Sequence, residues 1–200
     1  MKVLTIVAHP RDDSLTQKVT AAFIDGLKEK GVEVELLDLY KSEFNPVLLQ
    51  QDEPHWENTT ITGYSDLVMK EIERVKSFDG LAFIFPVWWY SMPAIMKGYI
   101  DRVWNYNFAY GYDKLHYDRV MWIPLAGGNE ASYIKHGYAS MMEYYFNVAL
   151  AGFTGIKHSK TAILYETLVE GNMSDAEIKQ HYQQFIVDAK KLGHDYSTFK

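Results

Sequence analysis

The sequence predicts one doubly wound α/β domain over residues 1–200, built on a five-stranded parallel sheet with the strand order 2-1-3-4-5. Three observations support this prediction. Five short apolar stretches alternate along the chain with five segments of helical periodicity. The most apolar stretch, residues 81–85, contains no polar residue, as expected for a strand that helices cover on both faces. No repeat, low-complexity tract or linker divides the chain.

The first strand is predicted at residues 2–8, and the polar loop after it leads into a helix. Ser14 as N-cap and Gln17 three residues later fit a capping box, and Gly31 fits the end of this helix. Neither the dinucleotide motif G-x-G-x-x-G nor the P-loop motif occurs here. A phosphate site at this position would therefore depend on side chains and on free helix N–H groups.

The start of this helix is a candidate anion site. A helix N-terminus offers unpaired N–H groups and the positive end of the helix dipole, and both favour anions. His9, Ser14 and Thr16 lie there and could hold a phosphate. The alternative is that Ser14 only caps the helix and that His9 is an ordinary loop residue.

The second strand is predicted at residues 32–39, which alternate in polarity and then become apolar. An irregular polar stretch, residues 40–62, follows it. A connection of this length is often functional, and it lies where a loop could fold over a ligand. We assign no role to His55 and Trp56 within it. The next helix is predicted at residues 65–77, with four apolar residues facing inward: Leu67, Val68, Ile72 and Val75.

The third strand, residues 81–85, is the centre of the pattern. Pro86 ends it, because proline cannot donate a hydrogen bond to a neighbouring strand. Pro93 then opens a helix, with Ser91 or Met92 as its N-cap.

The loop between this strand and its helix is rich in aromatic residues. It carries Val87, Trp88, Trp89 and Tyr90 at the sheet edge where open α/β proteins bind ligands. A planar aromatic ligand would account for three rings in such a place. The alternative is that these rings cap the core or fill a subunit interface.

A second ring-rich loop, residues 105–112, precedes the fourth strand, which is predicted at residues 119–126. Pro124 would interrupt a central strand, so we place it at the end of this one, beyond the last paired residue. Gly127 and Gly128 follow, and they would let the backbone approach a ligand closely. An ordinary turn is the alternative for the two glycines.

The last third of the chain is predicted to hold a helix at 138–150, a strand at 160–165 and a final helix. Ser174 and Glu177 fit a capping box for that helix, and Gly193 fits its end. The helix at 138–150 is too apolar to face water all round, which indicates contact with a partner subunit. Strands 1, 3 and 4 are neighbours in the predicted order, so three loops should converge on one site: residues 9–16, 86–92 and 126–133.

The composition excludes several classes of function. A net charge of −6 and a pI near 5.6 argue against binding to nucleic acid. The chain has no cysteine, which excludes disulfides, thiol nucleophiles and cysteine-based metal sites. No apolar run reaches the ~18 residues of a membrane span, and the apolar part of the N-terminus is too short for a signal peptide. We therefore expect a cytoplasmic protein.

Four motifs carry a resemblance to a known family. The most specific is P-x-x-W-[YF]-x-x-P-A-I-x-K-G-x-[IF]-[DE]-R-V, which residues 86–103 meet. The others are H-x-x-x-x-S-x-T/N from His9, F-A-Y-x-Y at residues 108–112, and Gly127-Gly128 followed five residues later by Tyr133. With these motifs the chain resembles, over nearly its whole length, the flavodoxin-like NAD(P)H:quinone oxidoreductases. This group includes DT-diaphorase and the short bacterial quinone reductases.

The resemblance implies a role for each matching residue. The flavin phosphate would be held by His9, Ser14, Leu15 and Thr16. The isoalloxazine ring would be lined by Pro86, Val87, Trp88, Trp89 and Tyr90. Its pyrimidine end would face Gly127 and Gly128, and the catalytic Tyr133 would hydrogen-bond near the C2 carbonyl. In a homodimer, the substrate would be sandwiched by two residues from the other subunit, Tyr110 and Tyr112.

The resemblance also implies the activity: a flavin-dependent NAD(P)H oxidoreductase that reduces quinones or similar aromatic acceptors by ping-pong hydride transfer. FMN is the expected cofactor, with FAD possible, because the chain lacks the extra C-terminal domain of the longer FAD-containing members. A flavodoxin-like electron carrier and an ancillary subunit of a potassium efflux system are the alternatives. The chain departs from the family pattern at Leu125-Ala126, where many relatives carry threonine, and at Ala139, where relatives carry histidine. His136 is the nearest histidine to that place.

Overall fold

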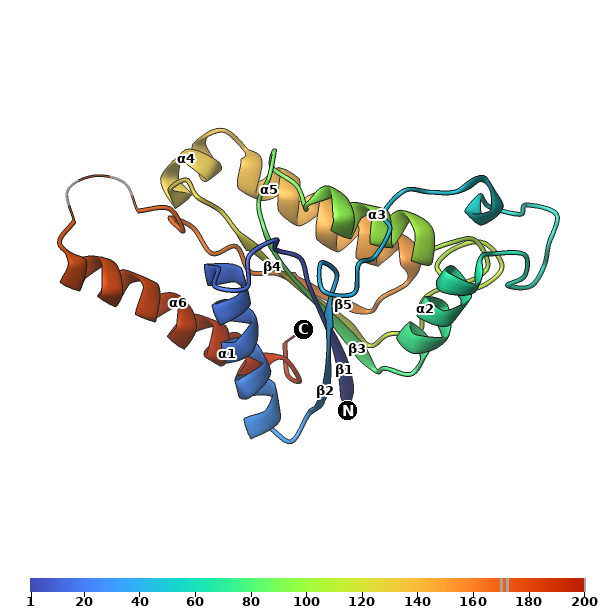
Figure 1. Cartoon of the computed structure of the whole chain (residues 1–200), viewed down its shortest axis with the longest axis horizontal. Helices are drawn as coiled ribbons and strands as arrows, with labels where there is room; N and C mark the ends of the chain where they lie inside the picture. The colour runs from blue at the N-terminus through green and yellow to red at the C-terminus, as the bar shows by residue number, and fades with distance from the viewer. Residues whose placement is uncertain (170, 172, 200) are drawn as a thin grey trace.

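Within residues 1–169, 171 and 173–199, which the computed structural model describes, five parallel strands form one sheet (Figure 1). The strand order is β2-β1-β3-β4-β5, as predicted from the sequence. The strands are β1 (Lys2–Val7), β2 (Glu33–Asp38), β3 (Gly80–Pro86), β4 (Arg119–Leu125) and β5 (His158–Thr161). The predicted flavodoxin-like architecture is therefore confirmed.

Helices cover both faces of this sheet (Figure 1). On one face lie α1 (Leu15–Glu29) and α6 (Asp175–Asp195). On the other lie α2 (Asp66–Lys76), α3 (Ala94–Val103) and α5 (Tyr138–Glu143), the last continued by the π-helix η2 (Tyr144–Gly152). A short helix α4 (Glu130–Lys135) stands at the carboxyl edge, and a single 3₁₀ turn, η1 (Gln50–Asp52), interrupts the long connection after β2.

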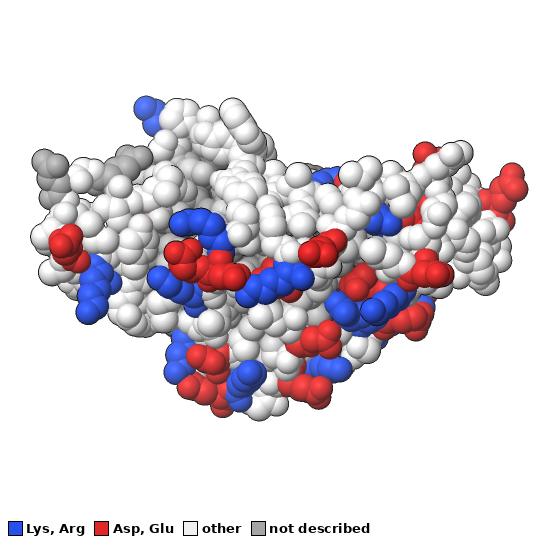
Figure 2. Space-filling model, in the orientation of Figure 1, with Lys and Arg blue, Asp and Glu red and all other residues white. Residues whose placement is uncertain are grey.

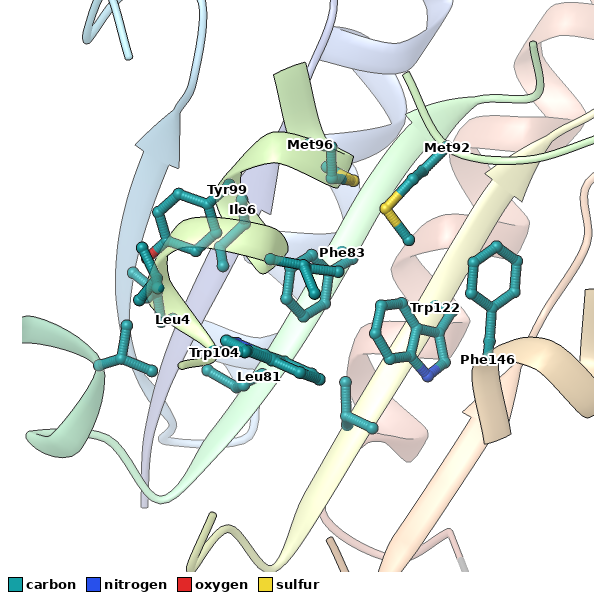
Figure 3. Packing of buried hydrophobic residues seen from close by; sticks show 14 of the residues in the cluster. Leu4, Ile6, Leu81, Phe83, Met92, Met96, Tyr99, Trp104, Trp122 and Phe146 are labelled. Atoms are coloured by element: carbon teal, nitrogen blue, oxygen red, sulfur yellow. The ribbon is translucent and has the colours of Figure 1, made fainter. Parts of the chain in front are cut away.

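The central strands are fixed by a stack of aromatic rings (Figure 3). The ring of Trp122 lies nearly parallel to those of Phe83 and Phe146, at centroid distances of 4.6 and 5.2 Å. All three side chains are fully buried. Such packing leaves β3 and β4 little freedom, and it holds the loops that follow them in fixed positions.

Pro124 lies inside the paired region, so its predicted place beyond the last pair is wrong. Pairing of β4 with β3 continues through Leu125, which is opposite Pro86. The carbonyl of Pro124 accepts the N–H of Leu164 on the β5 side. The missing N–H of Pro124 must face the same side, because the two polar groups of one strand residue point the same way. This explains why β5 ends at Thr161, although the predicted strand was 160–165, and why only an isolated bridge forms at Leu164.

Several helix ends also differ from the prediction. Helix α6 continues past Gly193, which does not end the helix as predicted. This glycine instead allows α6 to pack closely on α1, since a Cβ here would overlap the backbone of Phe23. Helix α3 starts one residue late, at Ala94, with Pro93 as its N-cap. The stretch predicted as a loop up to residue 133 contains α4. The apolar helix predicted at 138–150 continues to residue 152 through its π-helical half.

Candidate functional site

A cleft of 660 Å³ opens at the carboxyl edge of the sheet. It is formed by the loops that follow β1, β3, β4 and β5, together with one face of α6. The three loops that the sequence singled out therefore do meet at one place. Eight of the predicted cofactor-binding residues line the cleft: His9, Ser14, Leu15, Thr16, Pro86, Val87, Trp88 and Gly127.

The N-terminus of α1 points its free donors into one end of this cleft. Ser14 caps the helix by accepting the N–H of Gln17 at 3.2 Å. The N–H groups of Leu15 and Thr16 have no acceptor within the helix, because both residues stand in its first turn. The predicted capping box is only half formed, because the side chain of Gln17 donates to Asp38 instead, at 2.7 Å. This end of the cleft suits an anion.

His9 adds a further donor to the same end. Its Nδ1 accepts the backbone N–H of Arg11 at 3.1 Å, so a neutral ring carries its proton on Nε2. Burial lowers the pKa of His9, which keeps the ring neutral at pH 7. His9 can therefore donate one hydrogen bond from Nε2 without bringing a positive charge.

The loop after β3 forms a tight hairpin. Trp88 and Ser91 exchange two backbone hydrogen bonds of 3.1 Å, and the residues between them, Trp89 and Tyr90, have φ angles of +53° and +59°. Two left-handed residues in a two-residue turn define type I′, which asparagine and glycine favour. A left-handed backbone costs other residues roughly 1–2 kcal/mol each. Trp88 consequently lines the cleft, while the side chain of Trp89 is 95% exposed.

Rings from α4 and α5, the helices that follow β4, pack against this hairpin. Tyr90 stacks on Tyr138 at a centroid distance of 4.0 Å, and Tyr133 lies 5.8 Å from both rings. Burial raises the pKa of Tyr133, so its phenol stays protonated and can act as a hydrogen-bond donor at neutral pH. Tyr90, Tyr133 and Gly128 stand next to the cleft but do not line it.

The two glycines after β4 sit where there is little room for a side chain. A Cβ on Gly127 would come within 2.7 Å of Leu168, and a Cβ on Gly128 within 3.1 Å of the Tyr133 ring. The loop after β5 packs against this backbone, since Glu166 donates its N–H to the Gly128 carbonyl at 3.0 Å. Gly127 therefore brings its backbone into the cleft wall beside the side chain of Leu168, and this backbone can approach a ligand closely.

The structure adds cleft residues that sequence analysis missed. They are Arg11, Asp13, Lys18, Leu125, Thr167, Leu168, Lys179, Tyr182, Gln183 and Ile186. The last four recur at helical spacing on one face of α6, and that mixed polar face was the available signal. Tyr182 and Ile186 also pack against the core. Thr167 and Leu168 follow the fifth strand, whose loop lies at the same edge as the other three.

Tyr110 and Tyr112 lie far from the cleft. They belong to a ring platform made of Trp56, Tyr106, Tyr110, Tyr112 and Phe153, with neighbouring centroids 4.9 to 6.3 Å apart. Tyr138 packs beside Tyr90 at the cleft, whereas Phe153 belongs to the platform at the other end of the same helical stretch. At about 1.5 Å of rise per residue, these ends are roughly 20 Å apart.

The long connection after β2 packs against α3 and the segment that carries this platform, and it does not fold over the cleft. Its Asp52 forms an ion pair with Arg102 of α3 at 2.7 Å, and both side chains are almost completely buried. Asn105 donates to the Asp52 carbonyl at 2.6 Å, and Asn107 to the Asn58 carbonyl at 2.7 Å. None of residues 40–62 lines the cleft, so our expectation of a loop over the ligand is not met.

Charge on the surface is mixed. Figure 2 shows acidic and basic side chains interspersed over the visible face, without an extended patch of one sign. Three cations nevertheless gather in the cleft: Arg11, Lys18 and Lys179. Asp13 lines the cleft beside them.

Among the described residues, no helix is long and apolar enough to cross a membrane.

Comparison with known proteins agrees with this architecture. Residues 1–187 match a family model described as flavodoxin-like fold. The chain is 38% identical over 169 residues to YcaK of Escherichia coli K12, which is named an uncharacterized NAD(P)H oxidoreductase. That match covers 84% of this chain and 85% of YcaK. A second relative is NAD(P)H dehydrogenase [quinone] 1 of Cavia porcellus, 32% identical over 68% of this chain and 57% of its own length.

Among solved structures, the chain resembles the NAD(P)H:quinone oxidoreductase of Methanothermobacter marburgensis with a TM-score of 0.86. The two are 28% identical, and the match covers 100% of this chain and 98% of the other.

Proposed function

We infer the activity of this protein from the fact that its chain belongs to the flavodoxin-like fold family: it is a flavin-dependent NAD(P)H oxidoreductase that reduces quinones or similar aromatic acceptors. The observation that carries this conclusion is the cleft itself. It joins an anion-binding helix end to an aromatic wall and to bare backbone. A flavin mononucleotide unit needs these three environments, for its phosphate, its ring and the pyrimidine edge of that ring.

The residues present fit such a cofactor. The N–H groups of Leu15 and Thr16, the Nε2–H of His9 and the cap Ser14 form a donor set for the phosphate. Trp88 offers an aromatic wall for the ring. Gly127 adds a point of the cleft wall that carries no side chain, beside Leu168.

A bound flavin would supply the redox chemistry, accepting hydride from NAD(P)H and passing the electrons to the acceptor in the same slot. The protein supplies orientation and electrostatics. The protonated phenol of Tyr133 and the backbone around Gly127 would stabilise negative charge that develops on the pyrimidine edge. A slot used in turn by two substrates predicts ping-pong kinetics.

We further propose that the cleft accepts FAD, which the sequence left possible, as well as the expected FMN. The cleft does not end at the phosphate position but continues along α6, past Lys179, Tyr182 and Gln183. Lys18 and Arg11 also line it. These cations suit a second phosphate, and the Tyr182 ring suits a nucleobase.

The cofactor itself can be identified directly. We would release it by heat and identify it by chromatography and mass spectrometry, which separates FMN from FAD. Lys179→Ala should weaken FAD binding by several-fold and leave FMN affinity unchanged, because only the longer cofactor reaches α6. Equal weakening of both, or of neither, would show that the extension of the cleft does not bind an adenylate.

We propose a homodimer in which each ring platform completes the site of the partner. Tyr110 and Tyr112 cannot reach the cleft of their own chain. The helical stretch between cleft and platform carries exposed apolar side chains at helical spacing, Met141, Tyr144 and Val148. A two-fold axis through the middle of this stretch would exchange its two ends, so that the platform of one chain faces the hairpin of the other.

Complementation tests this arrangement. Tyr110→Ala and Ser14→Ala each impair a different half of the site. If the halves come from different chains, unfolding and refolding the two variants together should recover activity, because about a quarter of all sites would then be intact. If mixing recovers nothing although gel filtration shows a dimer, the platform does not act on the partner subunit.

The primary test of the proposed function is the visible absorbance spectrum of the purified protein, before and after NAD(P)H is added without oxygen. Flavin bands that bleach on reduction, and return when a quinone is added, would support both half-reactions. A protein that shows no flavin bands, and takes up neither FMN nor FAD, would refute the proposal.

A further inference from the structure

We propose that Tyr138 is a positioning residue: its ring holds Tyr90, and through it the Trp88–Ser91 hairpin, in the conformation that receives the flavin ring. This inference rests on the proposed function. None of the four sequence motifs includes Tyr138, which is the first residue of the apolar helix predicted at 138–150.

The hairpin needs an external contact to keep its shape. Trp89 and Tyr90 are both left-handed, at φ of +53° and +59°, in a turn type that other residue types prefer. The base of the hairpin is fixed, since Val87 donates its N–H to the Leu125 carbonyl at 2.8 Å. The tip is not fixed by Trp89, because that side chain is 95% exposed and packs on almost nothing. Whatever holds the tip must act through Tyr90.

Tyr138 provides that contact. The centroid of its ring lies 4.0 Å from that of Tyr90, which is the shortest ring distance in this cluster, and the interplanar angle is 28°. Tyr133 meets both rings at 5.8 Å with tilted or edge-on geometry, and His136 lies nearly parallel to Tyr138 at 5.5 Å. The stack is thus supported on more than one side.

The contact also joins two walls of the site. Tyr90 belongs to the loop after β3, while Tyr138 opens α5, which follows the glycine loop and α4. Gly137, with φ of +74°, makes the turn between the two helices and so places Tyr138 over the hairpin. Holding both loops at one separation is what a flat ring between them requires.

The experiment compares three variants with wild type: Tyr138→Ala removes the ring, Tyr138→Phe keeps it, and Ile134→Ala trims an exposed side chain on neighbouring α4 as a matched control. Flavin is titrated into flavin-free protein, and the dissociation constant is read from flavin fluorescence. We expect Tyr138→Ala to weaken binding by about 3- to 10-fold, the worth of one aromatic pair, with Tyr138→Phe and Ile134→Ala within about twofold of wild type. Equal affinity for Tyr138→Ala and Tyr138→Phe would overturn the proposal.

A rescue separates positioning from general damage to the fold. Asparagine tolerates the left-handed region, so Trp89→Asn should hold the turn without help from the stack. Adding Tyr138→Ala to Trp89→Asn should then cost less affinity than adding it to wild type. If the loss is the same in both backgrounds, Tyr138 does not act through the hairpin. If Tyr138→Ala does not fold, Tyr138→Leu gives the same comparison with the apolar volume kept.

A readout on flavin-free protein keeps this inference distinct from the proposed function. Near-ultraviolet circular dichroism reports fixed tyrosine and tryptophan rings. Tyr138→Ala should reduce this signal, and Tyr138→Phe should reduce it less. A protein that never binds flavin would refute the oxidoreductase, whereas an unchanged spectrum in Tyr138→Ala would refute the stack as a holder of the hairpin.

Discussion

Replacing Arg102 by methionine should destabilise the protein more than any exposed change on the same helix. Arg102 donates to Asp52 at 2.7 Å and to the Asn45 carbonyl at 2.6 Å, and thereby ties the long connection after β2 to α3. The exposed fractions of the two charged side chains are 2% and 0%. Methionine keeps most of the volume but leaves the Asp52 carboxylate buried without its cation.

The size of the effect follows from what Asp52 retains. Breaking a buried pair by removing one partner costs about 3–5 kcal/mol, because the remaining charge is uncompensated. Asp52 still accepts the N–H and the hydroxyl of Ser65, at 2.7 and 3.0 Å, so the lower end of the range applies. With a urea dependence of about 2 kcal/mol per M, a loss of about 3 kcal/mol lowers the unfolding midpoint by roughly 1.5 M.

The assay is urea unfolding of flavin-free protein at one fixed concentration, because cofactor and subunit binding both shift apparent stability. Lys97→Met is the matched control: it breaks the exposed ion pair with Asp101 on the same helix, which should cost under about 1 kcal/mol. The double variant Arg102→Met/Asp52→Asn should recover part of the loss, since no buried charge remains. If Arg102→Met costs no more than Lys97→Met, or if the double variant is no more stable than Arg102→Met alone, this reasoning is refuted.

Three further outcomes are expected. Ser14→Ala should lose about 1 kcal/mol of stability and also flavin affinity, whereas Ser174→Ala, at the N-cap of α6, should lose stability alone. Urea unfolding measures the stability, and flavin titration measures the affinity. Equal flavin affinities of the two variants would contradict the phosphate site. Tyr133→Phe should slow turnover with little loss of flavin, and unchanged rates in stopped-flow reduction would remove Tyr133 from the mechanism. Burial alone would raise the pKa of Asp52, but hydrogen bonds from Ser65 and Arg102 hold it below its usual range. Its contribution to stability is therefore present above about pH 4 and lost as pH falls through the lowered pKa, so the stability gap between wild type and Asp52→Asn should close in acid.

The strands could be predicted from local signals, and the doubly wound order that their alternation with helices favours then implied that three loops meet. Unbroken apolar runs such as residues 81–85 mark buried strands, and the carboxyl ends of neighbouring parallel strands must share one edge. Gly193 was misread for the opposite reason. A glycine near a helix end usually marks the end, but here it allows α6 to approach α1, and only the neighbouring helix reveals that. The effect of Pro124 also depends on long-range structure: its missing N–H shortens the pairing with β5, and only the sheet reveals which neighbouring strand it faces.

The least predictable part of the site is the hairpin, although its aromatic residues are conspicuous in the sequence. Trp88 and Trp89 are adjacent and identical, yet one lines the cleft and the other is 95% exposed. Strand periodicity would place them on opposite faces, but it cannot say which face holds the ligand. Two consecutive left-handed residues decide it, and nothing in Trp-Tyr favours that turn. The stacking contact from Tyr138 supports this conformation, and it comes from a helix that begins almost fifty residues later in the chain. Local sequence therefore identifies which residues gather at this edge, while their orientation is set by contacts between segments that no local pattern connects.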